Sequence, residues 1–187
     1  MDIVFSGISL PQSAALTAPS SEGALGQSCV SREKLNFTEV SIMLIAIIGE
    51  NCVGKTTLAN KINEKLGAKI YAGKDYLRLE KNPLAAAETF KATLKASIEG
   101  NNIIYLITEK EHIQFLPEGA FKIVLSAELE VIKERFKARM RGNLPLPLEK
   151  MLEANHGIYD NIPCDMHLEN GYDIDAVVDE IKNLSNK

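Results

Sequence analysis

The sequence predicts an α/β fold, in which a five-stranded parallel sheet carries helices on both faces. Apolar runs typical of buried strands alternate with segments whose apolar residues recur at helical spacing, the pattern of strand–helix–strand units. A glycine-rich loop joins the first apolar run to the first helical segment. The alternation continues to residue 184 without an internal repeat or a second domain.

The glycine-rich loop has the pattern G-x-x-x-x-G-K-[ST] between a buried strand and a helix, the context in which this pattern binds phosphate. Its glycines let successive N–H groups point at one anion, and the following helix adds the positive end of its dipole. Lys55 would contact the outer phosphates and Thr56 would offer a hydroxyl to Mg²⁺. We expect phosphate binding by Gly49, Glu50, Asn51, Cys52, Val53, Gly54, Lys55, Thr56 and Thr57, called here the phosphate loop.

Local signals place the other elements. Gly67 suits the position after a helix, Asn82 followed by Pro83 suits a helix start, and Asp173 would cap the last helix. The periodicity predicts strands at 42–48, 69–71, 102–109, 121–125 and 166–168, and helices at 54–66, 83–98, 129–140, 148–159 and 174–184. Since parallel strands end at one edge, the phosphate loop, Asp75 and Glu109 should lie there together.

The composition of the chain limits the class of protein it can belong to. The chain has 187 residues, is 45% hydrophobic and 25% charged, and so suits one globular domain. A net charge of -4 without a lysine-rich block argues against nucleic acid as a partner. No apolar stretch reaches the roughly 20 residues of a membrane span. The three cysteines are Cys29, Cys52 and Cys164, and none of them forms a C-x-x-C pair. This spacing argues against a disulfide framework or a zinc site and favours a cytoplasmic protein.

Residues 1–40 differ from the rest, because Ser, Ala, Gly and Gln dominate and no periodicity persists. We expect a disordered leader or an extension there, ahead of a domain at 42–187. A signal or transit peptide is the alternative. Asp2 stands where such a signal carries a basic residue, and Pro11 ends its apolar run.

From the phosphate loop onward, residues 42–184 resemble the small P-loop kinases: nucleoside monophosphate kinases such as adenylate kinase, with shikimate and gluconate kinases as close cousins. The resemblance implies a three-layer P-loop NTPase fold with a short lid, and ATP with Mg²⁺ as cofactors. It also implies that Lys55 bridges the β- and γ-phosphates during transfer.

The resemblance implies further roles by position. Residues 73–78 are similar to the Gly-Asp-x-x-Arg pattern of adenylate kinases, with Lys74 inserted. Asp75 would then contact the acceptor or a magnesium-bound water, and Arg78 would bind the acceptor's phosphate or carboxylate. The alternative is a solvated loop with an Asp–Arg pair.

The same family has an arginine-bearing helix and lid. Arg135 and Arg139, four residues apart on one helix face, would stabilise the transferred phosphoryl group, and Arg141 would follow at the edge of the lid. Glu109 ends an apolar strand, where a carboxylate can hold magnesium through water. Either Asp75 or Glu109 could serve that ion. Asn170 resembles the loop residue beside the adenine.

The expected function is therefore transfer of the γ-phosphoryl group of MgATP to a small acceptor, with a nucleotide or nucleoside favoured. A small-metabolite kinase similar to shikimate or gluconate kinases is an alternative. So is a non-catalytic ATP- or GTP-binding regulatory protein, although the Asn-Lys-x-Asp motif of GTP switches is absent. We expect a monomer or a small homo-oligomer.

Overall fold

The computed structural model describes residues 44–98 and 100–185, so the expectations for residues 1–40 lie outside it. The described chain contains a five-stranded parallel sheet in the order β2-β3-β1-β4-β5. Its strands are β1 (Leu44–Gly49), β2 (Lys69–Ala72), β3 (Ile103–Ile107), β4 (Phe121–Leu125) and β5 (Met166–Leu168). The predicted parallel α/β fold is confirmed.

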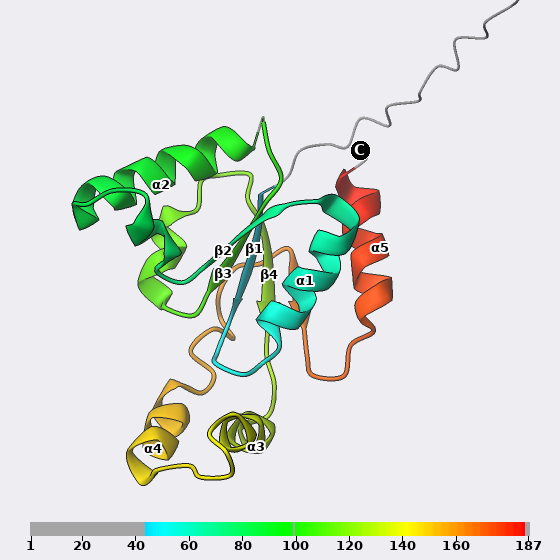
Figure 1. The fold of residues 1–187 in the computed structure, drawn as a ribbon. Coiled ribbons are helices and arrows are strands. Elements are labelled where there is room, and N and C mark those ends of the chain that lie inside the picture. Colours follow the sequence, from blue (N-terminus) through cyan, green and yellow to red (C-terminus); the bar gives the residue numbers. More distant parts are fainter. Residues whose placement is uncertain (1–43, 99, 186–187) are drawn as a thin grey trace, which may run out of the picture. The chain divides into compact units, whose positions relative to one another are not determined.

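Helices cover both faces of this sheet, as Figure 1 shows. α1 and α5 lie on one face and α2 on the other, whereas α3 and α4 lie beyond the strand ends beside the phosphate loop. The helices are α1 (Lys55–Leu66), α2 (Pro83–Ser97), α3 (Leu129–Arg139), α4 (Leu146–Asn155) and α5 (Ile174–Ser185).

Strand β1 is buried on both faces, which explains its unbroken apolar run. Ile45 and Ile47 pack toward α1 and α5, whereas Ala46 and Ile48 pack toward α2. Because side chains alternate along a strand, β1 contributes to two separate cores at once. This places the start of the phosphate loop on a rigid support.

The predicted helix boundaries hold where a specific side chain or glycine marks them. Gly67 ends α1 in the left-handed conformation, with φ 60°, and its N–H donates to the Asn63 carbonyl. The Asn82 side chain accepts a 2.9 Å hydrogen bond from the Leu84 N–H at the start of α2. Asp173 accepts a 3.0 Å bond from the Asp175 N–H and so caps α5.

Several boundaries differ from the prediction, and two of these differences bear on the site. β3 ends at Ile107, so Glu109 lies beyond the strand and precedes an unpredicted 3₁₀ helix, η2 (Lys110–Phe115). α4 ends at Asn155, because His156 is extended with a ψ of 133°, and Gly157 then takes a φ of 77°, so the predicted helix 148–159 is interrupted. That positive φ suits glycine and explains why the apolar pattern alone overextended the helix.

The turn between α3 and α4 is tight. Arg141 has a φ of 60°, and Gly142 donates its N–H to the Lys137 carbonyl at 2.8 Å. These contacts satisfy the last carbonyls of α3 and reverse the chain. In the part of the chain that the structure describes, none of the helices combines the length and apolar character needed to cross a bilayer.

Candidate functional site

A pocket of about 660 Å³ lies at the carboxyl ends of the strands. The phosphate loop, the ends of β2 and β3, α3 and the loop after β5 all contribute to it. Its lining consists of Asn51, Cys52, Val53, Gly54, Lys55, Thr56, Thr57, Ala72, Gly73, Leu106, Thr108, Arg135, Arg139, Asn170, Gly171, Tyr172 and Ile174.

The backbone of the phosphate loop is shaped by close packing and by two left-handed residues. A Cβ on Gly49 would lie 2.5 Å from the Leu125 carbonyl oxygen, so only glycine fits where β1 meets β4. Gly54 has a φ of 111° and Cys52 a φ of 62°. Gly54 is also the N-cap of α1, and neither a capping side chain nor an acidic residue occupies the first turn of that helix. The first turn therefore presents its N–H groups and the positive end of its dipole to the pocket.

Lys55 is buried, with 8% of its surface exposed, and its ammonium group folds back onto the loop. Nζ donates to the Gly49 carbonyl at 2.9 Å and to the Glu50 carbonyl at 2.6 Å. Burial lowers the pKa of Lys55 to about 8, against the opposing attraction of Cys52 and Glu50; the positive charge of Arg139 lowers it further. A phosphate anion would relieve this cost of burial and raise the pKa again.

Two arginines of α3 enter the same pocket. Arg135 donates from Nη1 to the Cys52 carbonyl at 3.2 Å and from Nη2 to the Asn170 side-chain oxygen at 2.6 Å. It thereby joins the phosphate loop to the loop after β5. Arg139, one turn further along α3, lines the pocket and lies close enough to Lys55 for its charge to lower the lysine pKa. With Lys55, these side chains make the pocket strongly cationic.

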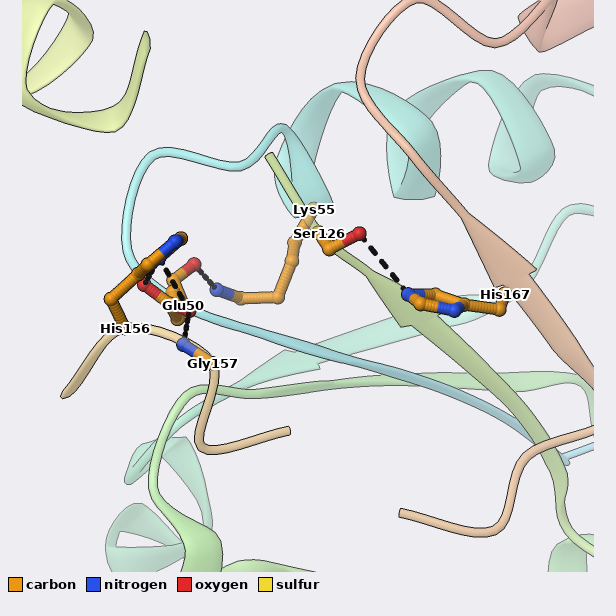
Figure 2. A network of polar contacts seen from close by, with 6 residues as sticks. All are labelled: Glu50, Lys55, Ser126, His156, Gly157 and His167. Atoms are coloured by element: carbon orange, nitrogen blue, oxygen red, sulfur yellow. Dashed lines mark hydrogen bonds and ion pairs between the residues drawn. The ribbon is translucent and has the colours of Figure 1, made fainter. Parts of the chain in front are cut away.

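Glu50 holds a second connection to the phosphate loop, which Figure 2 shows. One carboxylate oxygen accepts the Gly157 N–H at 2.8 Å, and His156 Nδ1 lies 3.4 Å from the carboxylate. Only 11% of the Glu50 side chain is exposed. The acid is therefore directed away from the pocket, toward the end of α4.

Comparison with known proteins places this geometry on a known fold. No protein-family model matches the sequence, and no curated protein matches it either. Solved structures do match. A shikimate kinase from Acinetobacter baumannii in complex with shikimate aligns with a TM-score of 0.54 and 14% identity over 78% of this chain and 93% of its own.

Two more structures agree. A gluconokinase from Sinorhizobium meliloti 1021 aligns with a TM-score of 0.52 and 14% identity over 78% of this chain and 92% of its own. An uncharacterized protein from Eubacterium ventriosum aligns with a TM-score of 0.55 and 17% identity over 78% of this chain and 99% of its own. The chain has the fold of the small P-loop kinases.

On this kinase fold, part of the predicted site comes together. All residues of the phosphate loop from Asn51 to Thr57 line the pocket, as do Arg135, Arg139 and Asn170. Gly49 and Glu50 form the base of the loop instead. The phosphate loop and the two arginines are about 80 residues apart in the sequence, and the fold brings them to the same pocket, as predicted.

Four other predicted residues do not line the pocket. Asp75 accepts the Ala72 N–H at 2.9 Å and lies 3.8 Å from Arg78, and both belong to η1 (Asp75–Arg78), the 3₁₀ helix after β2. Glu109 pairs with Lys74 at 3.1 Å and with His112 at 3.3 Å. Arg141 occupies the turn after α3. Their predicted roles with acceptor, metal and lid therefore stay predictions.

Two residues that line the pocket were not predicted from the sequence. Thr108 and Tyr172 line the pocket, and burial raises the pKa of the Tyr172 hydroxyl. Thr108 directly follows β3, so its place at the strand ends could have identified it. Tyr172 directly follows Asn170 and Gly171, the turn that was predicted to lie beside the adenine. An aromatic residue at that position was the signal that could have identified it.

Among the described residues that line the pocket, none is Asp or Glu. The described chain also has no cluster of three or more His, Cys, Asp or Glu residues that could hold a metal ion by themselves. The oxygen donor next to Lys55 is the exposed Thr56, whose hydroxyl can complete the shell of an Mg²⁺ ion bound mainly to phosphates and water. The residues therefore suit an ion that arrives with a nucleotide.

Proposed function

We propose that this protein is a phosphotransferase that moves the γ-phosphoryl group of MgATP to a small anionic acceptor, with a nucleotide favoured. The observation that carries the proposal is the convergence of Lys55, Arg135 and Arg139 on one pocket with the start of α1. Such a set suits a triphosphate, because backbone N–H groups, a buried ammonium and guanidinium groups all favour negative charge.

Each group has a distinct task in this proposal. The N–H groups of the phosphate loop bind and orient the phosphates. Lys55 leaves the carbonyls of Gly49 and Glu50 and bridges the β- and γ-phosphates, where charge develops during transfer. Arg139 stabilises the moving phosphoryl group, and Arg135 holds the loop at Asn170 beside the base. MgATP supplies the phosphoryl group, and Thr56 would hold its ion.

The lining of the pocket also favours a class of acceptor. A hydroxyl must lose a proton when it attacks phosphorus, and a carboxylate base commonly accepts that proton. No Asp or Glu lines the pocket in the part of the chain that the structure describes. A phosphate oxygen is already ionised at neutral pH and needs no such base. The acceptor oxygen then attacks the γ-phosphorus, the bond to the β-phosphate oxygen breaks, and ADP leaves.

The test is ADP release from MgATP in the presence of single acceptors. The panel contains nucleoside monophosphates, shikimate and gluconate, and Lys55→Ala purified in the same way is the control. We expect release with a phosphate-bearing acceptor and a loss of several orders of magnitude in Lys55→Ala. Release with shikimate or gluconate would favour the metabolite-kinase alternative. Nucleotide binding without release from any acceptor would favour a regulatory protein.

A further inference from the structure

The carboxylate of Glu50 connects the phosphate loop to the segment that follows α4. It accepts the Gly157 N–H at 2.8 Å and lies 3.4 Å from His156 Nδ1 (Figure 2). Gly157 has a φ of 77°, and a Cβ on it would lie 3.0 Å from Asp160 Oδ2. The contact therefore depends on a backbone shape that glycine adopts most easily. It fixes the end of α4 against the residue that follows β1.

α4 is in turn joined to α3 by a lysine that three carboxylates surround. Lys133 Nζ lies 2.7 Å from Glu153, 3.2 Å from Glu149 and 3.7 Å from Glu130. The side chain of Lys133 is 14% exposed, and hydrogen bonds to Glu153 and Glu149 raise its pKa. A single isolated ion pair at a surface contributes little, but several charges in one network hold a geometry better. α3 and α4 are thus linked as a pair.

α3 returns to the phosphate loop through Arg135, which donates to the Cys52 carbonyl at 3.2 Å. The contacts therefore form a closed ring. The ring runs from Glu50 through Gly157, α4, Lys133 and α3 to Arg135, and it ends on the same loop two residues from its start. Arg139 lies one turn beyond Arg135 on α3 and lines the pocket.

We propose that Glu50 is a positioning residue, which acts through α4 and α3 to set the place of Arg139 beside Lys55. The inference rests on the proposed function, because it concerns the grip of that same site on a nucleotide. Glu50 makes no contact with the ligand through its carboxylate in this proposal. Its effect on the nucleotide therefore depends on the presence of Arg139. A carboxylate that only stabilised the fold would act independently of that arginine.

A double-mutant cycle tests this dependence, with the binding of a non-hydrolysable MgATP analogue measured by calorimetry. We expect Glu50→Ala and Arg139→Ala each to weaken binding about tenfold. In the Glu50→Ala background, Arg139→Ala should cost about twofold or less. Glu50→Gln should stay within about threefold of the wild type, because its amide oxygen still accepts the Gly157 N–H. Independent effects, which multiply to about a hundredfold, would overturn the proposal.

A second variant cuts the ring far from the pocket. Lys133→Met removes the link between α3 and α4, and it should weaken binding and reduce the contribution of Arg139 as Glu50→Ala does. If thermal unfolding shows that Glu50→Ala does not fold, the Lys133→Met variant tests the proposal in its place. Glu134→Gln, an exposed substitution on α3 that removes one charge of the opposite sign, should bind like the wild type. If Arg139→Ala costs the same with and without Lys133, the proposal fails. If the wild type binds no nucleotide, the proposed function fails first and the inference with it.

Discussion

The side-chain oxygen of Asn170 accepts a 2.6 Å hydrogen bond from Arg135, although the two residues are 35 positions apart. The bond joins the loop after β5 to α3, and both residues line the pocket. Because Arg135 also donates to the Cys52 carbonyl, Asn170 is linked to the phosphate loop through one guanidinium group.

Asn170→Ala should therefore weaken the binding of an MgATP analogue about tenfold, since one hydrogen bond to a charged donor contributes about 1.5 kcal/mol. Calorimetry measures the change. Glu169→Ala is the matched control, since this neighbouring exposed side chain should alter affinity by less than twofold. Equal losses in the two variants would contradict the bridging role of Asn170.

Lys55 predicts a pH dependence of nucleotide binding. Its pKa of about 8 lies below that of an ordinary lysine, chiefly because of burial, and the ammonium form is the one that attracts phosphate. Affinity for MgATP should be steady up to about pH 8 and fall as the pH rises further, by up to about tenfold per unit. Binding near pH 8.5 should take up protons, because bound phosphate raises the lysine pKa.

Calorimetry in buffers of different ionisation enthalpy measures that uptake. Arg139→Ala supplies a control within the same pocket. Removal of the neighbouring positive charge should raise the pKa of Lys55, so the fall in affinity should move to higher pH. An affinity that stayed constant to pH 9.5 would show that Lys55 remains charged and contradict the effect of burial.

Gly49 should tolerate no side chain. A Cβ there would lie 2.5 Å from the Leu125 carbonyl oxygen and 3.1 Å from Val53 Cγ2. Gly49→Ala is expected to lower the free energy of unfolding by about 2–3 kcal/mol, since the backbone of β4 would have to shift. Gly67→Ala, which meets no atom within 4 Å but has a φ of 60°, should cost about 1 kcal/mol. Denaturant unfolding compares them, and equal costs would argue against the steric explanation.

His112 should make stability depend on pH. It is 4% exposed, its Nδ1 has no hydrogen-bond partner among the described residues, and burial lowers its pKa. The unfolded chain therefore binds a proton at a higher pH than the folded protein does. The free energy of unfolding should fall as the pH drops below about 6.5, the ordinary histidine value.

His112→Phe should remove this part of the pH dependence and keep the ring contacts with Tyr76 and Phe115. Denaturant unfolding at pH 7.5 and 5.5 measures it. The wild type should lose more stability than the variant between these two values. An equal loss in both proteins would mean that other groups alone carry the pH dependence.

The parts of the fold that could be predicted are those that a short stretch of sequence determines by itself. β1 and β3 are buried on both faces, so each appears as an unbroken apolar run, and Asn82 and Gly67 mark helix ends by their own chemistry. The 3₁₀ helix η2 has no such signal. It is held by packing of Ile113 and Phe115 against the core on the α2 side of the sheet.

The site divides in the same way. The phosphate loop is a continuous stretch, so its pattern identified it. The partner of Glu50 is 107 residues away at Gly157, and nothing in the motif distinguishes Glu50 from the variable residues beside it. Asp75 and Glu109 were placed at the strand ends by topology alone. Which way their carboxylates turn depends on neighbours such as the Ala72 N–H and Lys74.

The two carbonyl groups that accept the ammonium of Lys55 act as an internal competitor for any incoming molecule. An uncharged ligand offers Lys55 only neutral hydrogen-bond acceptors, and the carbonyls of Gly49 and Glu50 already provide these. A multiply charged anion offers more, and so can draw the ammonium outward. If the pocket binds phosphate as proposed, these two hydrogen bonds would favour multiply charged anions over neutral metabolites.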